Sequence, residues 1–347
     1  MISRLFSRLP HVLLAILVSV IAAGCSAEEV AVTSPWPVAQ AERVIDKPAP
    51  PPIWPLTGLA ASDSALPTAR RIVSVKVENS PAARPQSGLQ LADVVYESIT
   101  EGGITRFNCM FHSQIPETVG PVRSARFSDV KLVPQYAPLF AFSGANSRVN
   151  AAIRSAGLQN LSQDAGISNG YSRVRSRPAP HNLYLDLGKI REEGVKRGFP
   201  ATQELRRLNF ERGVSNPGAL PAAGISIPFS TANRVEWTYD AAADAYVRAN
   251  NGSVHKDALT GEQLRATNVV VMWAKATPTQ PAGTYDIALT GSNRVSVFRN
   301  GQRIDGTWNA AADSPPTFSA ADGSPVRLSP GNTWFQVVST EVNITVR

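Results

Sequence analysis

Cysteine and histidine are scarce in this sequence. Its 347 residues include two cysteines, Cys25 and Cys109, and four histidines. Two cysteines cannot build a disulfide framework, and no group of histidine and cysteine residues has the spacing of a zinc site. We therefore expect no metal and no other cofactor, and a fold that depends on its hydrophobic core, with Cys109 as a small apolar member.

The sequence also lacks an apolar run long enough to span a membrane, which takes roughly 20 residues. The run HVLLAILVSVIAAGC falls short of this; it ends at Cys25 and follows Arg4 and Arg8. Basic residues, an apolar stretch and small residues in this order are typical of a signal peptide, which we place at residues 1–24.

The end of this run, AAGC, resembles a bacterial lipobox. That resemblance implies a diacylated Cys25 and a protein anchored by lipid to the cell membrane, on its extracytoplasmic face. An ordinary secreted protein, cleaved nearby, and an uncleaved anchor are the alternatives.

Composition divides the rest of the chain into three parts. Residues 25–56 are rich in proline and alanine, which predicts an extended tether. Residues 57–214 mix strand-like and helix-like patterns, whereas residues 225–347 contain short strand-like runs separated by turn residues. The sequence therefore predicts an α+β fold, in which a mixed α/β N-terminal domain precedes a smaller, mostly antiparallel β domain.

Individual segments carry more local signals. Alternation of apolar and polar residues predicts strands at 71–79, 91–99 and 104–113, the last two joined by a tight turn at TEGG. Helical spacing and stop signals predict helices at 123–136, 147–157, 185–198 and 201–213. In the second half, Asn300-Gly301 between two strand patterns predicts a hairpin with a type I′ turn.

Seven segments, taken in series, resemble the YerB-like bacterial lipoproteins. They are ENSPAARPQSGLQLADVVYE, EGGITRF, GPVRSAR, RSRPAPHNLY, VHKDALTGEQLRATNVVVMW, FRNGQRIDGTW and LSPGNTWFQVV. The resemblance covers nearly everything after residue 56, and it implies paired N- and C-terminal domains and a lipoprotein. It implies no settled reaction, so the candidate chemistry below comes from the residues themselves.

Positive charge is concentrated in one part of the chain. The formal net charge is +7, and residues 123–212 contain 15 Lys and Arg against 7 Asp and Glu. Such an excess indicates an anionic partner, and the expected compartment disfavours nucleic acid. We therefore expect an anionic envelope polymer or a lipid head group as ligand, with membrane attachment through Cys25 and another envelope protein as a further partner.

Arginines recur near the ends of predicted strands in the N-terminal half, where α/β folds build their sites. Guanidinium groups bind phosphate and carboxylate through paired N–H donors. We assign ligand binding to Arg84, Arg106, Arg123, Arg126, Arg173, Arg177 and Ser143. The alternative for each arginine is an internal ion pair with Glu97 or Glu101, since buried charges are almost always paired.

Two other function classes stay open. Glu97 and Glu101 flank a turn, and His181 lies in a polar loop, so an envelope hydrolase or transferase could use them as acid and base. A protein-interaction scaffold without a small ligand is the other possibility. Sequence alone does not give the separation of these groups in space.

Overall fold

The computed structural model describes residues 52–63, 66–213, 218–280 and 284–347. The predicted signal peptide, Cys25 and nearly all of the predicted tether lie outside these residues. None of the helices in the described part of the chain is long and apolar enough to cross a membrane.

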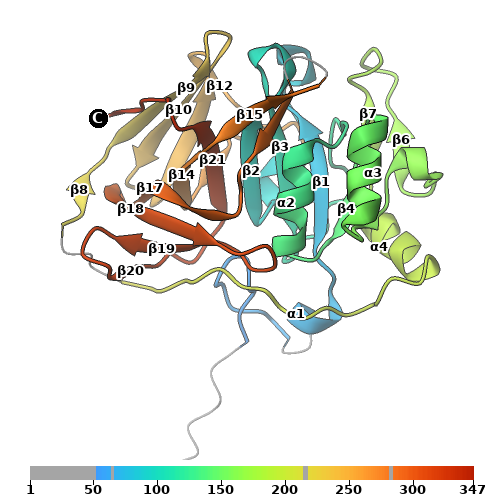
Figure 1. Cartoon of the computed structure of the whole chain (residues 1–347), viewed down its shortest axis with the longest axis horizontal. Coiled ribbons are helices and arrows are strands. Elements are labelled where there is room, and N and C mark those ends of the chain that lie inside the picture. The colour runs from blue at the N-terminus through green and yellow to red at the C-terminus, as the bar shows by residue number, and fades with distance from the viewer. Residues whose placement is uncertain (1–51, 64–65, 214–217, 281–283) are drawn as a thin grey trace, which may run out of the picture. The chain divides into compact units, whose positions relative to one another are not determined.

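A 12-stranded mixed sheet runs through the described residues and contains strands from both halves of the chain (Figure 1). The spatial order is β20 (Pro325–Val326), β19 (Thr317–Ala320), β18 (Gln302–Ala310), β17 (Gly291–Arg299), β14 (Asn268–Ala274), β21 (Thr333–Ser339), β2 (Val94–Ile99), β3 (Thr105–Phe111), β1 (Val73–Glu78), β4 (Leu139–Ala141) and β5 (Gln159–Asn160), with β8 (Leu220–Pro221) beside β18.

Helices cover both faces of this sheet near β1 and β4. They are α2 (Phe127–Leu132), α3 (Ser147–Ser155) and α4 (Leu187–Lys196), and a short α1 (Leu66–Ala69) precedes β1. Figure 1 shows α2 and α3 together beside β1 and β4. Phe140 packs in one cluster with Ile153 of α3, whereas Leu139 packs with Ile190 of α4, because neighbouring strand residues point to opposite faces.

Strand β1 shows the same alternation with a polar face. Val75 and Val77 belong to the main core, and Lys76 points the other way and is 1% exposed. Its ammonium group lies 2.7 Å from Oδ1 of Asp129 in α2. Burial lowers the pKa of Lys76, although the Asp129 carboxylate opposes this shift. The buried pair therefore ties α2 to the sheet through charge as well as through apolar contacts.

A second, six-stranded sheet from the C-terminal half packs against the large one. It consists of β12 (Ser253–Val254), β11 (Ala245–Asn250), β10 (Asn233–Asp240), β9 (Gly224–Ser230) and β22 (Thr345–Val346), with β13 (Arg265–Ala266) beside β11. Two further hairpins are β6 (Tyr171–Arg173) with β7 (Leu183–Leu185), and β15 (Ala276–Thr279) with β16 (Thr284–Ile287).

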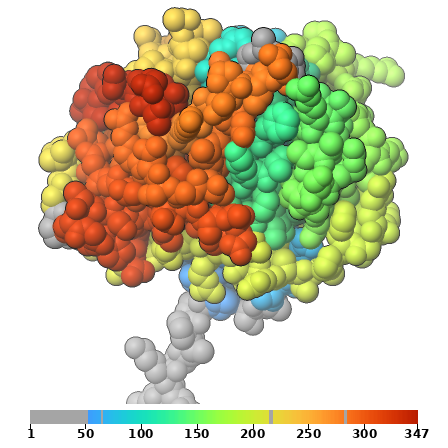
Figure 2. Space-filling model, in the orientation of Figure 1, coloured from blue at the N-terminus to red at the C-terminus, as the bar shows by residue number. Residues whose placement is uncertain are grey.

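The two halves meet where β2 pairs in parallel with β21, from Val94 opposite Thr333 to Ser98 opposite Val337. Phe107 from the first half and Trp334 from the second lie in the same core cluster, with ring centroids 5.3 Å apart. Residues of the two halves also meet in one continuous surface on the face shown in Figure 2. The change of composition near residue 215 therefore separates two kinds of secondary structure that share one sheet.

Comparison with the sequence shows where local patterns decide structure. The α+β class is confirmed, as are strands within 71–79, 91–99 and 104–113 and helices within 123–136, 147–157 and 185–198. Asn300 and Gly301 form a two-residue turn with φ of 51° and 69°, as a type I′ hairpin requires. Cys109 is fully buried, as expected of a small core residue.

The predicted helix at 201–213 is wrong. The segment runs extended along the lower edge of Figure 1. Oε1 of Gln203 accepts from the main-chain N–H of Ile72 at 2.9 Å, and the N–H of Leu208 donates to the carbonyl of Pro55 at 3.0 Å. These contacts to distant parts of the chain replace the local bonds that a helix would make, and Leu208 is buried among them.

The hairpin turn gives a test of the fold. A Cβ atom added to Gly301 would lie 2.7 Å from Cε1 of Tyr239, in addition to the unfavourable positive φ. We expect Gly301→Ala to lower the free energy of unfolding by more than the about 1–2 kcal/mol that a left-handed conformation costs an L-residue. Gly323→Ala is the matched control, since Gly323 has φ of 82° with nothing near its added Cβ. Urea unfolding measures both, and equal losses would contradict a role for the Tyr239 contact.

Candidate functional site

The site begins where the segment after Pro121 passes the end of β1. The main-chain N–H of Arg123 donates to the carbonyl of Lys76 at 2.8 Å, and the carbonyl of Arg123 accepts from the N–H of Ser143 at 3.0 Å. On the other side, the N–H of Val122 donates to the carbonyl of Leu183 at 2.7 Å. Main-chain bonds therefore bring together three segments that lie far apart in the sequence.

A polar hollow of about 280 Å³ opens beside these three segments. Its polar lining comes from Arg123, Ser124, Ser143, Gln163, Asp164 and Arg173. Three residues that the sequence assigned to ligand binding, Arg123, Ser143 and Arg173, thus lie together here. The hydroxyl oxygens of Ser124 and Ser143 are 3.4 Å apart, so two more hydrogen-bonding groups accompany the guanidinium groups.

Arg123 shares its carboxylate partner with another residue. Its Nε lies 3.4 Å from Oε2 of Glu78, and the same oxygen lies 2.9 Å from Nδ1 of His181. Glu78 is 2% exposed and also accepts from the hydroxyl of Ser80 at 2.8 Å. One buried carboxylate therefore contacts both Arg123 and His181.

Arg173 contacts no carboxylate among the described residues. Its Nη1 donates to Oδ1 of Asn182 at 2.9 Å, and its Nη2 donates to Oε1 of Gln163 at 3.3 Å. Both acceptors are neutral amides. The guanidinium of Arg173 is therefore held in position at the hollow while its full charge remains available for a ligand.

Arg106 and Arg126 lie together, but around Glu101 rather than in the hollow. Nε of Arg126 is 2.6 Å from Oε1 of Glu101, and Nη2 of Arg106 is 3.7 Å from its Oε2. Burial, followed by the charge of Arg126, lowers the pKa of Arg106 to about 10. Burial by itself would raise the pKa of Glu101, but the hydrogen bond and charge of Arg126 outweigh it and lower the pKa. These three residues therefore form an ion-pair cluster outside the hollow.

Arg177 and Arg84 lie elsewhere again. Arg177 donates from Nη1 to the carbonyl of Ala83 and from Nη2 to that of Pro85, both at 2.6 Å. Arg84 donates to Oδ1 of Asn79 at 2.9 Å and to its carbonyl at 2.8 Å. Burial, followed by the nearby charge of Arg248, lowers the pKa of Arg84 to about 10.

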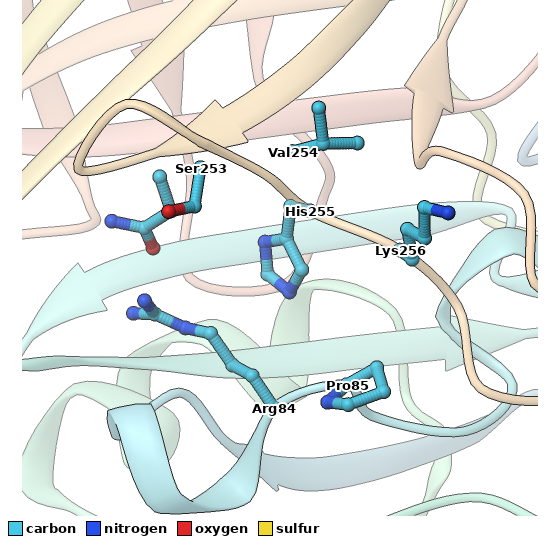
Figure 3. A pocket seen from close by; sticks show the side chains of 7 residues that line it. Arg84, Pro85, Ser253, Val254, His255 and Lys256 are labelled. Atoms are coloured by element: carbon cyan, nitrogen blue, oxygen red, sulfur yellow. The ribbon is translucent and has the colours of Figure 1, made fainter.

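Arg84 lines a separate hollow of about 240 Å³ between the two halves of the chain. Figure 3 shows Arg84 and Pro85 on one side and Ser253 to Lys256 on the other, with the ring of His255 directed toward Arg84. Nδ1 of His255 accepts from Nε of Arg248 at 2.9 Å, so Nε2 carries the proton toward Oε1 of Gln86, 2.7 Å away. Burial and the charge of Arg248 hold the pKa of His255 far below its usual value.

Glu97 is fully buried and is held by residues from both halves. Oε2 lies 3.0 Å from Nη2 of Arg248, and Oε1 accepts from Asn79 at 3.1 Å and from Thr105 at 2.6 Å. Arg248 is also fully buried. Glu97 therefore lies within the protein core and does not line the hollow of Arg123 and Arg173.

Four polar residues of this site are missing from the sequence assignments: Glu78, Ser124, Gln163 and Asp164. Glu78 carried a usable signal, because it ends the alternating pattern of β1 with a charge at a strand end. Gln163 and Asp164 belong to a short 3-10 turn at Gln163–Ala165, whose position beside Ser143 depends on contacts that only the folded chain makes.

The fold and the site define an α+β protein in which two consecutive sequence regions complete one sheet beside an arginine-lined hollow. Residues 56–200 match a family model described as "Protein of unknown function (DUF3048) N-terminal domain", and residues 225–335 match the corresponding C-terminal domain. The chain belongs to this family of YerB-like proteins, as its relatives also show.

One relative is "Putative lipoprotein YerB" from Bacillus subtilis (strain 168), which is 32% identical over 290 residues, or 82% of this chain and 85% of the relative. The crystal structure of YerB protein from Bacillus subtilis is similar to the present one, with a TM-score of 0.76 at 30% identity. That match covers 84% of this chain and 99% of the crystallised chain. The sequence resemblance to YerB-like proteins is therefore confirmed.

The buried ion pair gives a second test. We expect Glu97→Gln to lower the free energy of unfolding by about 3–5 kcal/mol, because it leaves the buried charge of Arg248 unpaired. Glu97→Gln combined with Arg248→Met should lose less than Glu97→Gln alone. Urea unfolding curves measure these differences.

Glu262→Gln is the control for this comparison. It removes an exposed partner of Arg265 at 3.3 Å and should cost less than about 1 kcal/mol. Equal stability of Glu97→Gln and the unaltered protein would contradict a structural role for the pair.

Proposed function

We propose that this protein is a lipid-anchored protein of the extracytoplasmic membrane face that binds an anionic cell-envelope ligand, bearing phosphate or carboxylate, in the hollow of Arg123 and Arg173. The observation that carries the proposal is the guanidinium of Arg173, which lines the hollow without a carboxylate partner among the described residues. A phosphate or carboxylate placed there would accept from guanidinium N–H groups and serine hydroxyls.

The neighbouring charges support an anionic ligand. Arg123 contributes a second guanidinium, and its partner Glu78 also pairs with His181. Residues 123–212 carry the basic excess of the chain, so the surrounding potential favours the approach of an anion.

The same geometry supports an enzyme less well. Glu97 is buried in the core, where it pairs with Arg248, and Glu101 pairs with Arg126 and Arg106. Neither carboxylate lines the hollow. His181 hydrogen-bonds to Glu78 and is not among the residues that line the hollow, whose carboxylate is that of Asp164. We therefore argue for binding rather than for acid and base catalysis.

Substitution of the two arginines tests the proposal. Each of Arg123→Gln and Arg173→Gln should weaken binding of inorganic phosphate about tenfold, since a hydrogen bond to a charged group contributes about 1.5–3 kcal/mol. The double variant should show no measurable binding by isothermal titration calorimetry of the full chain in detergent.

Arg126→Gln is the matched control, because Arg126 lies three residues from Arg123 but pairs with Glu101 outside the hollow. It should bind phosphate as the unaltered protein does, and far-UV circular dichroism should confirm that each variant is folded. Unchanged phosphate binding by the double variant would place any anion site elsewhere.

The anchor has its own test at Cys25. The segment AAGC and the relative named as a lipoprotein support diacylation of this residue. We expect Cys25→Ser, expressed in a bacterium, to lose incorporation of labelled palmitate and to leave the lipid-anchored membrane fraction. Cys109→Ser serves as control, because Cys109 is buried in the core. Undiminished labelling of the Cys25→Ser variant would contradict the proposal.

A further inference from the structure

Asp164 places a carboxylate in the same hollow as the two arginines. Within the described part of the chain, no hydrogen bond or ion pair holds this carboxylate. Arg123 takes Glu78 as its acidic partner, and Arg173 takes two amides. The hollow thus contains separate cationic and anionic groups that do not neutralise each other directly.

The position of Asp164 is built into the fold. Its main-chain N–H donates to the carbonyl of Ser143 at 3.2 Å, and the N–H of Gln163 donates to the carbonyl of Phe142 at 3.1 Å. These bonds dock the turn at Gln163–Ala165 against the segment that follows β4.

Gly144 provides the space for the carboxylate. A Cβ atom added to Gly144 would lie 1.8 Å from Oδ2 of Asp164 and 2.8 Å from its Oδ1. The present place of the carboxylate therefore depends on the missing side chain of Gly144. Any larger residue would push the carboxylate away from its present place beside Ser143.

From this arrangement we infer that the ligand is a zwitterion, a small anionic group that also carries an amine. The anion would bind Arg123, Arg173 and the serine hydroxyls, and the ammonium would pair with Asp164. This inference rests on the proposed function and deepens it, since Asp164 would repel an anion that lacks the amine. The volume of about 280 Å³ lies just below the about 300–1,000 Å³ of small-molecule sites, which suits a group of amino-acid size.

Matched probes with and without an amine test the inference. The phosphate pair is O-phosphoethanolamine against ethyl phosphate, and the carboxylate pair is β-alanine against propionate. We expect the full chain in detergent to bind the amine-bearing member of at least one pair about tenfold more tightly, the ratio that one charge-assisted bond supplies. The pair that shows the preference identifies the anionic group.

Asp164→Asn should bring that ratio close to one while ethyl phosphate or propionate binds at least as tightly as before. Gly144→Ala should also lower the ratio, because it displaces the carboxylate with Asp164 still present. Asp286→Asn is the control, since Asp286 pairs with Lys131 at 2.6 Å outside the hollow, and it should keep the preference.

The outcomes separate this inference from the proposed function. If no probe binds, the anion site itself is wrong. If amine-free and amine-bearing probes bind equally well to the unaltered protein, the anion site stands and the zwitterion inference is overturned. A preference that survives in folded Asp164→Asn and Gly144→Ala would also overturn it, because the amine would then be recognised by another group.

Discussion

The buried ion pair of Glu97 and Arg248 is the interaction on which the association of the two halves depends. Both side chains are fully buried, and each half of the chain supplies one of them. The guanidinium of Arg248 also lies 5.6, 5.3 and 5.0 Å from the ring centroids of Phe107, Trp237 and Trp334. A charge so far from water requires its partner, since an unpaired buried ion costs several kcal/mol. Neither half can therefore bury this region without the other, which is consistent with the shared sheet.

The arginines that the sequence assigned to ligand binding differ in their partners. Those outside the hollow of Arg123 and Arg173 are matched by acids or carbonyl groups of the fold, as Arg126 is by Glu101 and Arg177 by two main-chain carbonyls. Arg173, by contrast, is oriented by neutral amides. Because an amide fixes a guanidinium without cancelling its charge, this arrangement would hold Arg173 ready for the proposed anion at a modest entropic cost. The proposed binding accounts for only part of the clustering of basic residues in the sequence.

Local patterns were sufficient for the strands and helices that pack by a single apolar face. The alternation in β1 predicted the strand, although not the burial of its polar residues, and Asn300-Gly301 predicted its turn. The segment 201–213 failed because its hydrogen-bond partners, Ile72 among them, come from distant parts of the chain. For the site, the sequence indicated the type of side chain but not which ones meet, since Arg123, Ser143 and Arg173 come from segments far apart in the sequence. The sequence did not indicate Asp164 as a site residue, because the place of its carboxylate in the hollow depends on Gly144, which belongs to another loop.

Main-chain hydrogen bonds hold the segment of Arg123 in place, whereas side chains provide the contacts that would select a ligand. Arg123 is fixed on both sides by bonds to Lys76 and Ser143 that involve no side chain, so lining residues can change without loss of the frame. Arg173 instead projects from the two-stranded hairpin of β6 and β7, which lies outside the large sheet. The separation of the two guanidinium groups is therefore set by the position of that hairpin. A family that keeps the sheet and varies the hairpin could accept anions of different length on one scaffold, because only one wall of the site would have to move.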